Sequence, residues 1–244
     1  MMIFSKKRIS LFRYFSALAL LLLFLSNSCS SIGGSNQPPK KVLFIGNSYT
    51  DFNNGLDYQF LKFAPTAEAE RISLGGYTLQ NHWEDANTLQ TIRTGDWDVV
   101  ILQEQSQTPV TDYKAFAEYA QKLNEEIKVS GAETILFMTW ERPDSIQYGV
   151  TTSQLANNYT FLSQQLGIKV APVGLAFANA LQERPTLVLY SEDGHPTLQG
   201  TYLAVAIFYG IIYDQSPVGI NYNAGMSDED ALFLQNIAAH ALEK

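Results

Sequence analysis

The sequence predicts a three-layer α/β/α sandwich with a mainly parallel sheet. Apolar runs that are nearly continuous alternate with segments of helical periodicity, as expected when a parallel sheet is covered on both faces. The strand candidates are residues 42–45, 99–102, 134–139 and 169–173, with 71–74 as a less apolar fifth. Strands and helices that alternate in this way favour right-handed crossover connections and one sheet.

The helices are expected between and after these strands. Residues 111–129 show the clearest pattern, because Phe116, Ala120, Leu123 and Ile127 recur at helical spacing. The other expected helices are 58–63, 152–166, 199–213 and 227–242. Ser227 and Asp230 open the last one as an N-cap followed by an acid in the first turn.

The N-terminus has the features of an export signal. Residues 1–28 carry four basic side chains and no acidic one, with a short apolar core at 17–25. That core is shorter than the roughly 20 residues that span a bilayer. Cys29 follows L-S-N-S, where a bacterial lipoprotein carries its lipid, so we expect an exported, lipid-anchored protein with a flexible tether at 29–39 and a domain at 40–244. The alternative is an ordinary signal peptide that is cleaved nearby, in which case Cys29 carries no lipid.

Charge and composition exclude several functions. Without residues 1–28 the chain has 12 basic against 24 acidic side chains, a net charge of −12, which is unsuited to nucleic acid. A single cysteine allows no intramolecular disulfide, and three scattered histidines form no metal-binding pattern, so no metal is expected. Neither a phosphate loop nor G-x-G-x-x-G occurs, and no cofactor is expected.

Ser48 is the first candidate for chemistry. It lies in K-V-L-F-I-G-N-S-Y-T, directly after the first strand, where Gly46 permits a tight turn. Ligands bind beyond the carboxyl ends of parallel strands, and a following helix N-terminus favours developing negative charge. The competing interpretation is that Ser48 or Thr50 only caps the next helix.

A second candidate lies late in the chain, in S-E-D-G-H-P. A serine nucleophile needs a base, and the base needs an acid that orients it. His195 suits the base, and Glu192 or Asp193 could orient it. Asp-Gly and His-Pro also favour a plain surface turn.

Together the two stretches resemble the SGNH (GDSL-type) hydrolase superfamily, in a divergent branch found in bacterial surface proteins. G-N-S-Y-T matches the block that carries the nucleophile, and the last block matches D-x-x-H. The resemblance covers about residues 40–213 and implies a flavodoxin-like fold without cofactor. It implies Ser48 as nucleophile, His195 as base, and an oxyanion hole from the N–H groups of Ser48 and Gly76 (or Gly75) with the Gln105 amide.

Three positions depart from the family pattern. Asn47 replaces the aspartate before the serine, and Gln105 replaces the oxyanion asparagine in V-V-I-L-Q-E-Q-S, with Gln103 at the family's glycine. The family acid lies three residues before the histidine, which is Glu192 here, whereas Asp193 lies two before it. We expect Asp193 to orient His195, with Glu192 as the alternative acid.

Other residues have two interpretations each. His82 is expected at the surface or, alternatively, in the cleft, and His240 as structural or solvent-facing. Trp140, Glu141 and Arg142 either shape a substrate pocket or brace a loop through an Arg–Glu pair. Glu104 could hold Gln105 or its loop in place. Tyr77 and Trp83 either stack on a sugar or pack in the core.

The sequence therefore predicts a serine-dependent esterase that acts on acetyl or other acyl esters of carbohydrates or small molecules. The expected partners are a small-molecule or glycan ester and a membrane contacted only through the anchor, without nucleic acid. An alternative is a catalytically inactive surface module that binds glycan. A mononucleotide binder would need a phosphate-cradling loop that the sequence lacks.

Overall fold

The computed structural model describes residues 40–243 in addition to Met1. The expected signal peptide, the lipidation candidate Cys29 and the tether lie outside the described residues. Gln37–Lys244 forms one compact unit. Within the described part no helix is long and apolar enough to cross a membrane.

Five strands form one sheet in the order β2-β1-β3-β4-β5, and every neighbouring pair is parallel. The strands are β1 (Lys41–Gly46), β2 (Glu68–Ser73), β3 (Val99–Leu102), β4 (Glu133–Phe137) and β5 (Lys169–Ala171). The predicted α/β fold is confirmed, and its sheet is parallel throughout. Strand order reverses beside β1, whose two neighbours are β2 and β3, and such a reversal opens a crevice at the carboxyl ends.

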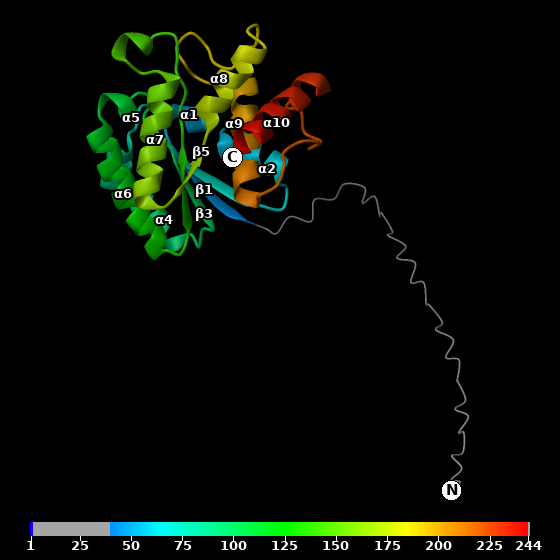
Figure 1. Cartoon of the computed structure of the whole chain (residues 1–244). Coiled ribbons are helices and arrows are strands. Elements are labelled where there is room, and N and C mark those ends of the chain that lie inside the picture. Colours follow the sequence, from blue (N-terminus) through cyan, green and yellow to red (C-terminus); the bar gives the residue numbers. More distant parts are fainter. Residues whose placement is uncertain (2–39, 244) are drawn as a thin grey trace. The chain divides into compact units, whose positions relative to one another are not determined.

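Helices cover both faces of the sheet (Figure 1). One face carries α3 (Leu79–Glu84), α4 (Ala86–Thr94), α6 (Tyr113–Val129) and α7 (Thr152–Leu166). The other carries α2 (Leu56–Phe63), α8 (Val173–Glu183), α9 (Leu198–Tyr213) and α10 (Asp228–Leu242). The described residues also contain three short helical turns: α1 (Ser48–Asp51), α5 (Thr108–Thr111) and the 3₁₀ helix η1 (Ile146–Tyr148).

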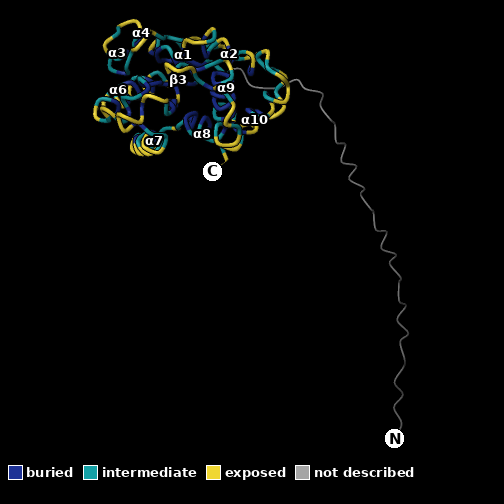
Figure 2. Tube along the Cα trace, turned by 90° about the horizontal axis from the view of Figure 1, so that it is seen from above, coloured by how far each residue is buried: buried dark blue, intermediate teal, exposed yellow. Residues whose placement is uncertain are grey.

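Alternate residues of β1 supply the two hydrophobic cores. Val42 and Phe44 pack with α2, α8, α9 and α10, whereas Leu43 and Ile45 pack with α3, α4, α6 and α7. All four side chains are fully buried, as the pleat of a strand covered on both faces requires. In Figure 2, α9 is buried inside the molecule, and the outer side of α7 is exposed.

Several predicted boundaries need correction. The strand expected at 134–139 ends at Phe137, and the one expected at 169–173 ends at Ala171. Val173 instead begins α8, because Pro172 stands as its N-cap and leaves the strand ladder. The expected helix 111–129 begins at Tyr113, where the Asp112 side chain accepts a hydrogen bond from Ala115 N.

Candidate active site

The turn after β1 places Ser48 at the start of a helical turn. Asn47 is the N-cap of α1, and its Oδ1 accepts a hydrogen bond from Tyr49 N at 3.1 Å. Gly46 is required here, because a Cβ would lie 2.3 Å from Thr50 Oγ1 and 2.4 Å from Gln103 Oε1. Ser48 is therefore the first helical residue, and the cap belongs to Asn47.

The late loop brings an imidazole to this serine. His195 Nε2 lies 2.9 Å from Ser48 Oγ, although the two residues are 147 positions apart in the chain. On the far side of the ring, His195 Nδ1 lies 2.9 Å from Asp193 Oδ2. This contact has the distance of a charge-assisted hydrogen bond but not its preferred angle. A serine, an imidazole and a carboxylate thus follow one another at contact distance.

Asp193, and not Glu192, is the acid that faces the ring. Asp193 Oδ1 accepts hydrogen bonds from Ser191 Oγ at 2.5 Å and from His195 N at 3.2 Å. The Ser191 hydroxyl and, after it, the His195 ring hold the pKa of Asp193 below its ordinary value. Glu192 is exposed, and no contact with His195 is found for it among the described residues.

Three consecutive carbonyl groups fix the loop around His195. Gly194 O accepts from Trp140 Nε1 at 3.1 Å, and His195 O accepts from Ser191 Oγ at 3.0 Å. Pro196 O accepts from Asn53 Nδ2 at 2.9 Å. Because Trp140 and Asn53 come from other parts of the chain, the loop is anchored on both sides of the histidine.

Aromatic rings limit the freedom of the imidazole. The Phe52 ring stacks on His195 at a centroid distance of 4.2 Å and an interplanar angle of 13°, and Tyr49 meets it edge-on at 5.7 Å. Phe52 is 41% exposed, and its ring covers one face of the imidazole. Phe52 and Asn53 come two and three residues after the nucleophile block, but no specific pattern in the sequence marks either of them as part of the site.

The glycine turn supplies candidate oxyanion donors. Tyr77 N donates to Leu74 O at 3.1 Å, and Gly76 has φ of +74°, which identifies a turn of the type that needs glycine at its third position. Asn47 Nδ2 donates to Tyr77 O at 2.9 Å and so ties this turn to the nucleophile. Within residues 40–243 no hydrogen bond engages the N–H of Ser48 or Gly76.

Gln105 has a different set of contacts from the expected one. Its Oε1 accepts from Gln107 N at 2.9 Å and from Thr108 N and Oγ1 at 3.2 Å, which caps the start of α5. Its Nε2 lies 3.4 Å from Ser106 Oγ, and the described residues show no contact with Ser48. The side-chain oxygen of Gln105 thus caps the helix, whereas its NH₂ group makes one long contact.

Gln103 braces the nucleophile turn more directly. Its Oε1 accepts from Asn47 N and Thr50 Oγ1, both at 2.9 Å, and its Nε2 donates to Asn47 Oδ1 at 3.0 Å. The family pattern has glycine here, so the resemblance offered no role for this side chain. A buried amide after an apolar strand was the available signal, because such a group must find partners.

Glu104 is a buried carboxylate between two parts of the site. Its Oε1 accepts from Gln105 N at 2.6 Å and from Leu79 N at 3.2 Å. Burial raises its pKa to about 7. It therefore joins the end of β3 to the start of α3, in agreement with the expected supporting role.

The other candidate residues lie in the core, pack beside it or lie at the surface. His82 is fully buried, which corrects the surface expectation: its Nε2 lies 2.8 Å from Gly46 O and its Nδ1 3.2 Å from Thr88 Oγ1. Burial lowers the pKa of His82. Tyr77 packs edge-on against His82. Trp83 packs against the core that contains Leu43 and Ile45. His240 is exposed, which agrees with the solvent-facing expectation.

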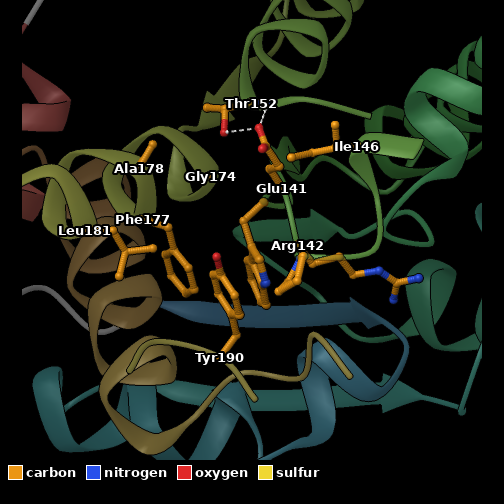
Figure 3. Close-up of a pocket in the computed structure, with 11 residues that line it drawn as sticks. Glu141, Arg142, Ile146, Thr152, Gly174, Phe177, Ala178, Leu181 and Tyr190 are labelled. Atoms are coloured by element: carbon orange, nitrogen blue, oxygen red, sulfur yellow. Dashed lines mark hydrogen bonds between the residues drawn. The ribbon is translucent and has the colours of Figure 1, made fainter. Parts of the chain in front are cut away.

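A pocket lies beside the triad loop (Figure 3). Its volume is about 320 Å³, and the residues that line it include Trp140, Phe177, Tyr190, Glu141 and Arg142. The alternative that Arg142 pairs with Glu141 is not found among the described residues. Glu141 instead accepts from Thr152 N at 2.7 Å, and Arg142 Nε pairs with Asp144 at 2.8 Å. No cluster of three metal-ligating side chains occurs in the described part of the chain.

Known structures share this fold. A proposed SGNH hydrolase from Slackia heliotrinireducens is 25% identical with a TM-score of 0.64, over 72% of this chain and 100% of that chain. The chain is a divergent member of the SGNH hydrolase superfamily. No family model and no curated protein matches its sequence.

Two further structures align with this SGNH member at lower identity. A DUF4886 family protein from Bacteroides uniformis is 16% identical with a TM-score of 0.68, over 84% of this chain and 95% of that chain. A catalytic mutant of an acetylxylan esterase from Geobacillus stearothermophilus is 16% identical with a TM-score of 0.54, over 77% and 97%. These two likenesses concern the fold.

Proposed function

We propose that this SGNH member hydrolyses acyl esters through a covalent acyl-enzyme on Ser48. The observation that carries the proposal is the chain of contacts from Ser48 Oγ to His195 Nε2 and from His195 Nδ1 to Asp193, each 2.9 Å long. A hydroxyl is a weak nucleophile until an adjacent base takes its proton, and the base works best when an acid holds its ring.

In the proposed reaction Ser48 Oγ attacks the ester carbonyl while its proton passes to His195 Nε2. The N–H groups of Ser48 and Gly76 stabilise the oxyanion, with the Gln105 NH₂ as a third donor. His195 then gives the proton to the leaving alcohol, which breaks the ester bond. Water, deprotonated by His195, releases the acid and restores Ser48. The scheme uses no metal or cofactor.

Among acyl esters, we propose acetyl esters of carbohydrates as the substrates. The support is the likeness in fold to an acetylxylan esterase and the expected export of the chain. We also propose that Cys29 carries a lipid anchor. Mass spectrometry of the mature N-terminus tests that part, because an N-terminus other than a lipidated Cys29 would contradict it.

One observation favours the alternative, an inactive module that binds glycan. Gln105 caps α5 through its oxygen, and loss of one oxyanion donor costs about 3–4 kcal/mol of transition-state stabilisation in comparable sites. An inactive module would have the same fold and the same neighbouring pocket but would not hydrolyse esters.

Hydrolysis of p-nitrophenyl acetate and of acetylated xylan by the purified protein distinguishes the esterase from the inactive module. We expect turnover that falls by at least about 10³-fold in Ser48→Ala, because the nucleophile is removed. The matched control is Ser130→Ala, which also removes a half-buried hydroxyl but at the C-cap of α6, away from the site. A folded protein without turnover, or with equal turnover in Ser48→Ala, would overturn the proposal.

A further inference from the structure

One buried side chain contacts a chain neighbour of the nucleophile and a chain neighbour of the base. Trp140 follows β4 at the carboxyl edge of the sheet and is 2% exposed. Its ring stacks on Tyr49 with centroids 4.3 Å apart and an interplanar angle of 4°, and Tyr49 is the residue after Ser48. Its Nε1 donates to Gly194 O at 3.1 Å, and Gly194 lies between Asp193 and His195.

The indole itself cannot easily move. Its ring also stacks on Phe177 of α8 at 4.4 Å and 15°, and Figure 3 shows Phe177 in the wall of the pocket. Trp140 is therefore held between α8 on one side and the nucleophile turn on the other. A buried aromatic side chain of this kind has few accessible rotamers.

The contact at Gly194 is close and specific. Gly194 has φ of +86°, and a Cβ there would lie 2.5 Å from Arg142 Cδ and 2.9 Å from Tyr49 Oη. Gly194 of the triad loop thus lies close to the hydroxyl of Tyr49, the residue whose ring stacks on Trp140. Its carbonyl is oriented toward the indole N–H, which fixes the peptide between the acid and the base.

We propose that Trp140 is a positioning residue that sets the placement of His195 relative to Ser48. The inference rests on the proposed function, since it assigns Trp140 a role in the same triad. Trp140 touches neither reacting atom: it acts through Tyr49 on the nucleophile side and through Gly194 on the base side. A displacement of about 1 Å between reacting groups can cost about a hundredfold in rate.

The test compares Trp140→Phe with Trp97→Phe in the purified full-length protein. Both changes keep an aromatic ring and remove one buried indole donor, because Trp97 Nε1 donates to Thr91 O at 2.8 Å and Trp97 is 4% exposed. Trp97 precedes β3 and so lies at the opposite edge of the sheet. Both variants are expected to lower the midpoint of thermal unfolding to a similar extent.

The two variants are expected to differ in catalysis. Trp140→Phe should lower kcat on p-nitrophenyl acetate about tenfold to a hundredfold with KM changed less than about twofold, because positioning affects the transition state. Trp97→Phe should keep kcat within about twofold of the parent. Equal effects of the two variants on kcat would overturn the proposal.

A second measurement does not depend on esterase activity. The imidazole ¹H and ¹⁵N signals of His195, identified by their absence in His195→Ala, are recorded at one pH for the parent and both variants. We expect them to shift in Trp140→Phe and to stay in place in Trp97→Phe. Unchanged His195 signals in Trp140→Phe would overturn the positioning role. A parent that turns over no ester but shows the shift would retain that role while the proposed function fails.

Discussion

The orientation of His195 depends on the carboxylate two residues before it in the chain. Asp193 reaches the ring with Oδ2 while its Oδ1 holds Ser191 Oγ and the backbone N–H of His195. The loop therefore folds back on itself, which the positive φ of Gly194 permits. The usual spacing of three residues is replaced by a tighter turn that points the aspartate, rather than the preceding glutamate, at the imidazole.

Asp193→Asn is expected to lower kcat on p-nitrophenyl acetate by up to about 10⁴-fold, the size of the effect in serine proteases of the chymotrypsin type, because the amide favours the wrong tautomer. Glu192→Gln is the matched control: it removes the neighbouring exposed carboxylate and should leave kcat within about twofold. Steady-state kinetics on both variants decide the assignment. A large loss in Glu192→Gln with little in Asp193→Asn would contradict it.

Only some residues of the candidate site could be predicted from the sequence. Ser48 and His195 could be named because each stands in a short local pattern that chemistry explains. The choice between Asp193 and Glu192 required the backbone path of the loop. The contacts of Gln105 could not be predicted, because its Oε1 meets the backbone of α5, a single turn with no periodic signal.

The end of β3 is the element that organises the site. Three consecutive side chains leave it in different directions: Gln103 to the nucleophile turn, Glu104 to the start of α3, and Gln105 to α5. Gln103 and Glu104 are buried, so their hydrogen bonds are made in a low-dielectric surrounding and leaving them unmade would be costly. The residues after this strand thus fix the relative positions of the nucleophile turn, the start of α3 and α5.

Glu104 makes stability depend on pH. Burial raises its pKa from 4.5 to about 7, so between these values the folded protein holds a proton that the unfolded chain has lost. The contribution of this group to stability is therefore greatest below about pH 4.5 and declines as pH rises through about 7, by up to about 3 kcal/mol.

Glu104→Gln keeps an oxygen acceptor for Leu79 N and Gln105 N without the ionisation. Urea unfolding from about pH 4.5 to about pH 8 is expected to show a variant that gains stability relative to the parent as pH rises. Glu183→Gln, which removes an exposed carboxylate on α8, controls for the change in net charge. A difference between Glu104→Gln and the parent that is constant over this range would contradict the account.

Elements were predictable where periodicity was strong. α6 and α7 have one buried stripe each, and α7 was predicted with its observed ends. α8 was missed because its sequence, V-G-L-A-F-A-N-A-L-Q-E, is rich in small apolar residues that follow β5 without a clear change of period. The short α3 and α4 were missed because six and nine residues carry little pattern.

At the scale of the whole molecule, one sheet carries the candidate site at its carboxyl edge. β1 brings Ser48, β3 brings the bracing amides, β4 brings Trp140, and the segment before α9 brings Asp193 and His195. Two separate cores hold the strands that carry these residues, and the order of the strands places β1 and β3 side by side. The arrangement is that of a divergent SGNH superfamily member, and the fold class followed from the alternation of strands and helices in the sequence.

The proposed function requires Ser48 to be an activated nucleophile. Labelling of the purified protein with a fluorophosphonate probe tests it most directly, because the probe reacts with a serine that a nearby base deprotonates and needs no knowledge of the substrate. We expect rapid labelling of the parent, none in Ser48→Ala and a marked decrease in His195→Ala. A folded parent that stays unlabelled, or a Ser48→Ala variant that labels as fast as the parent, would contradict the account.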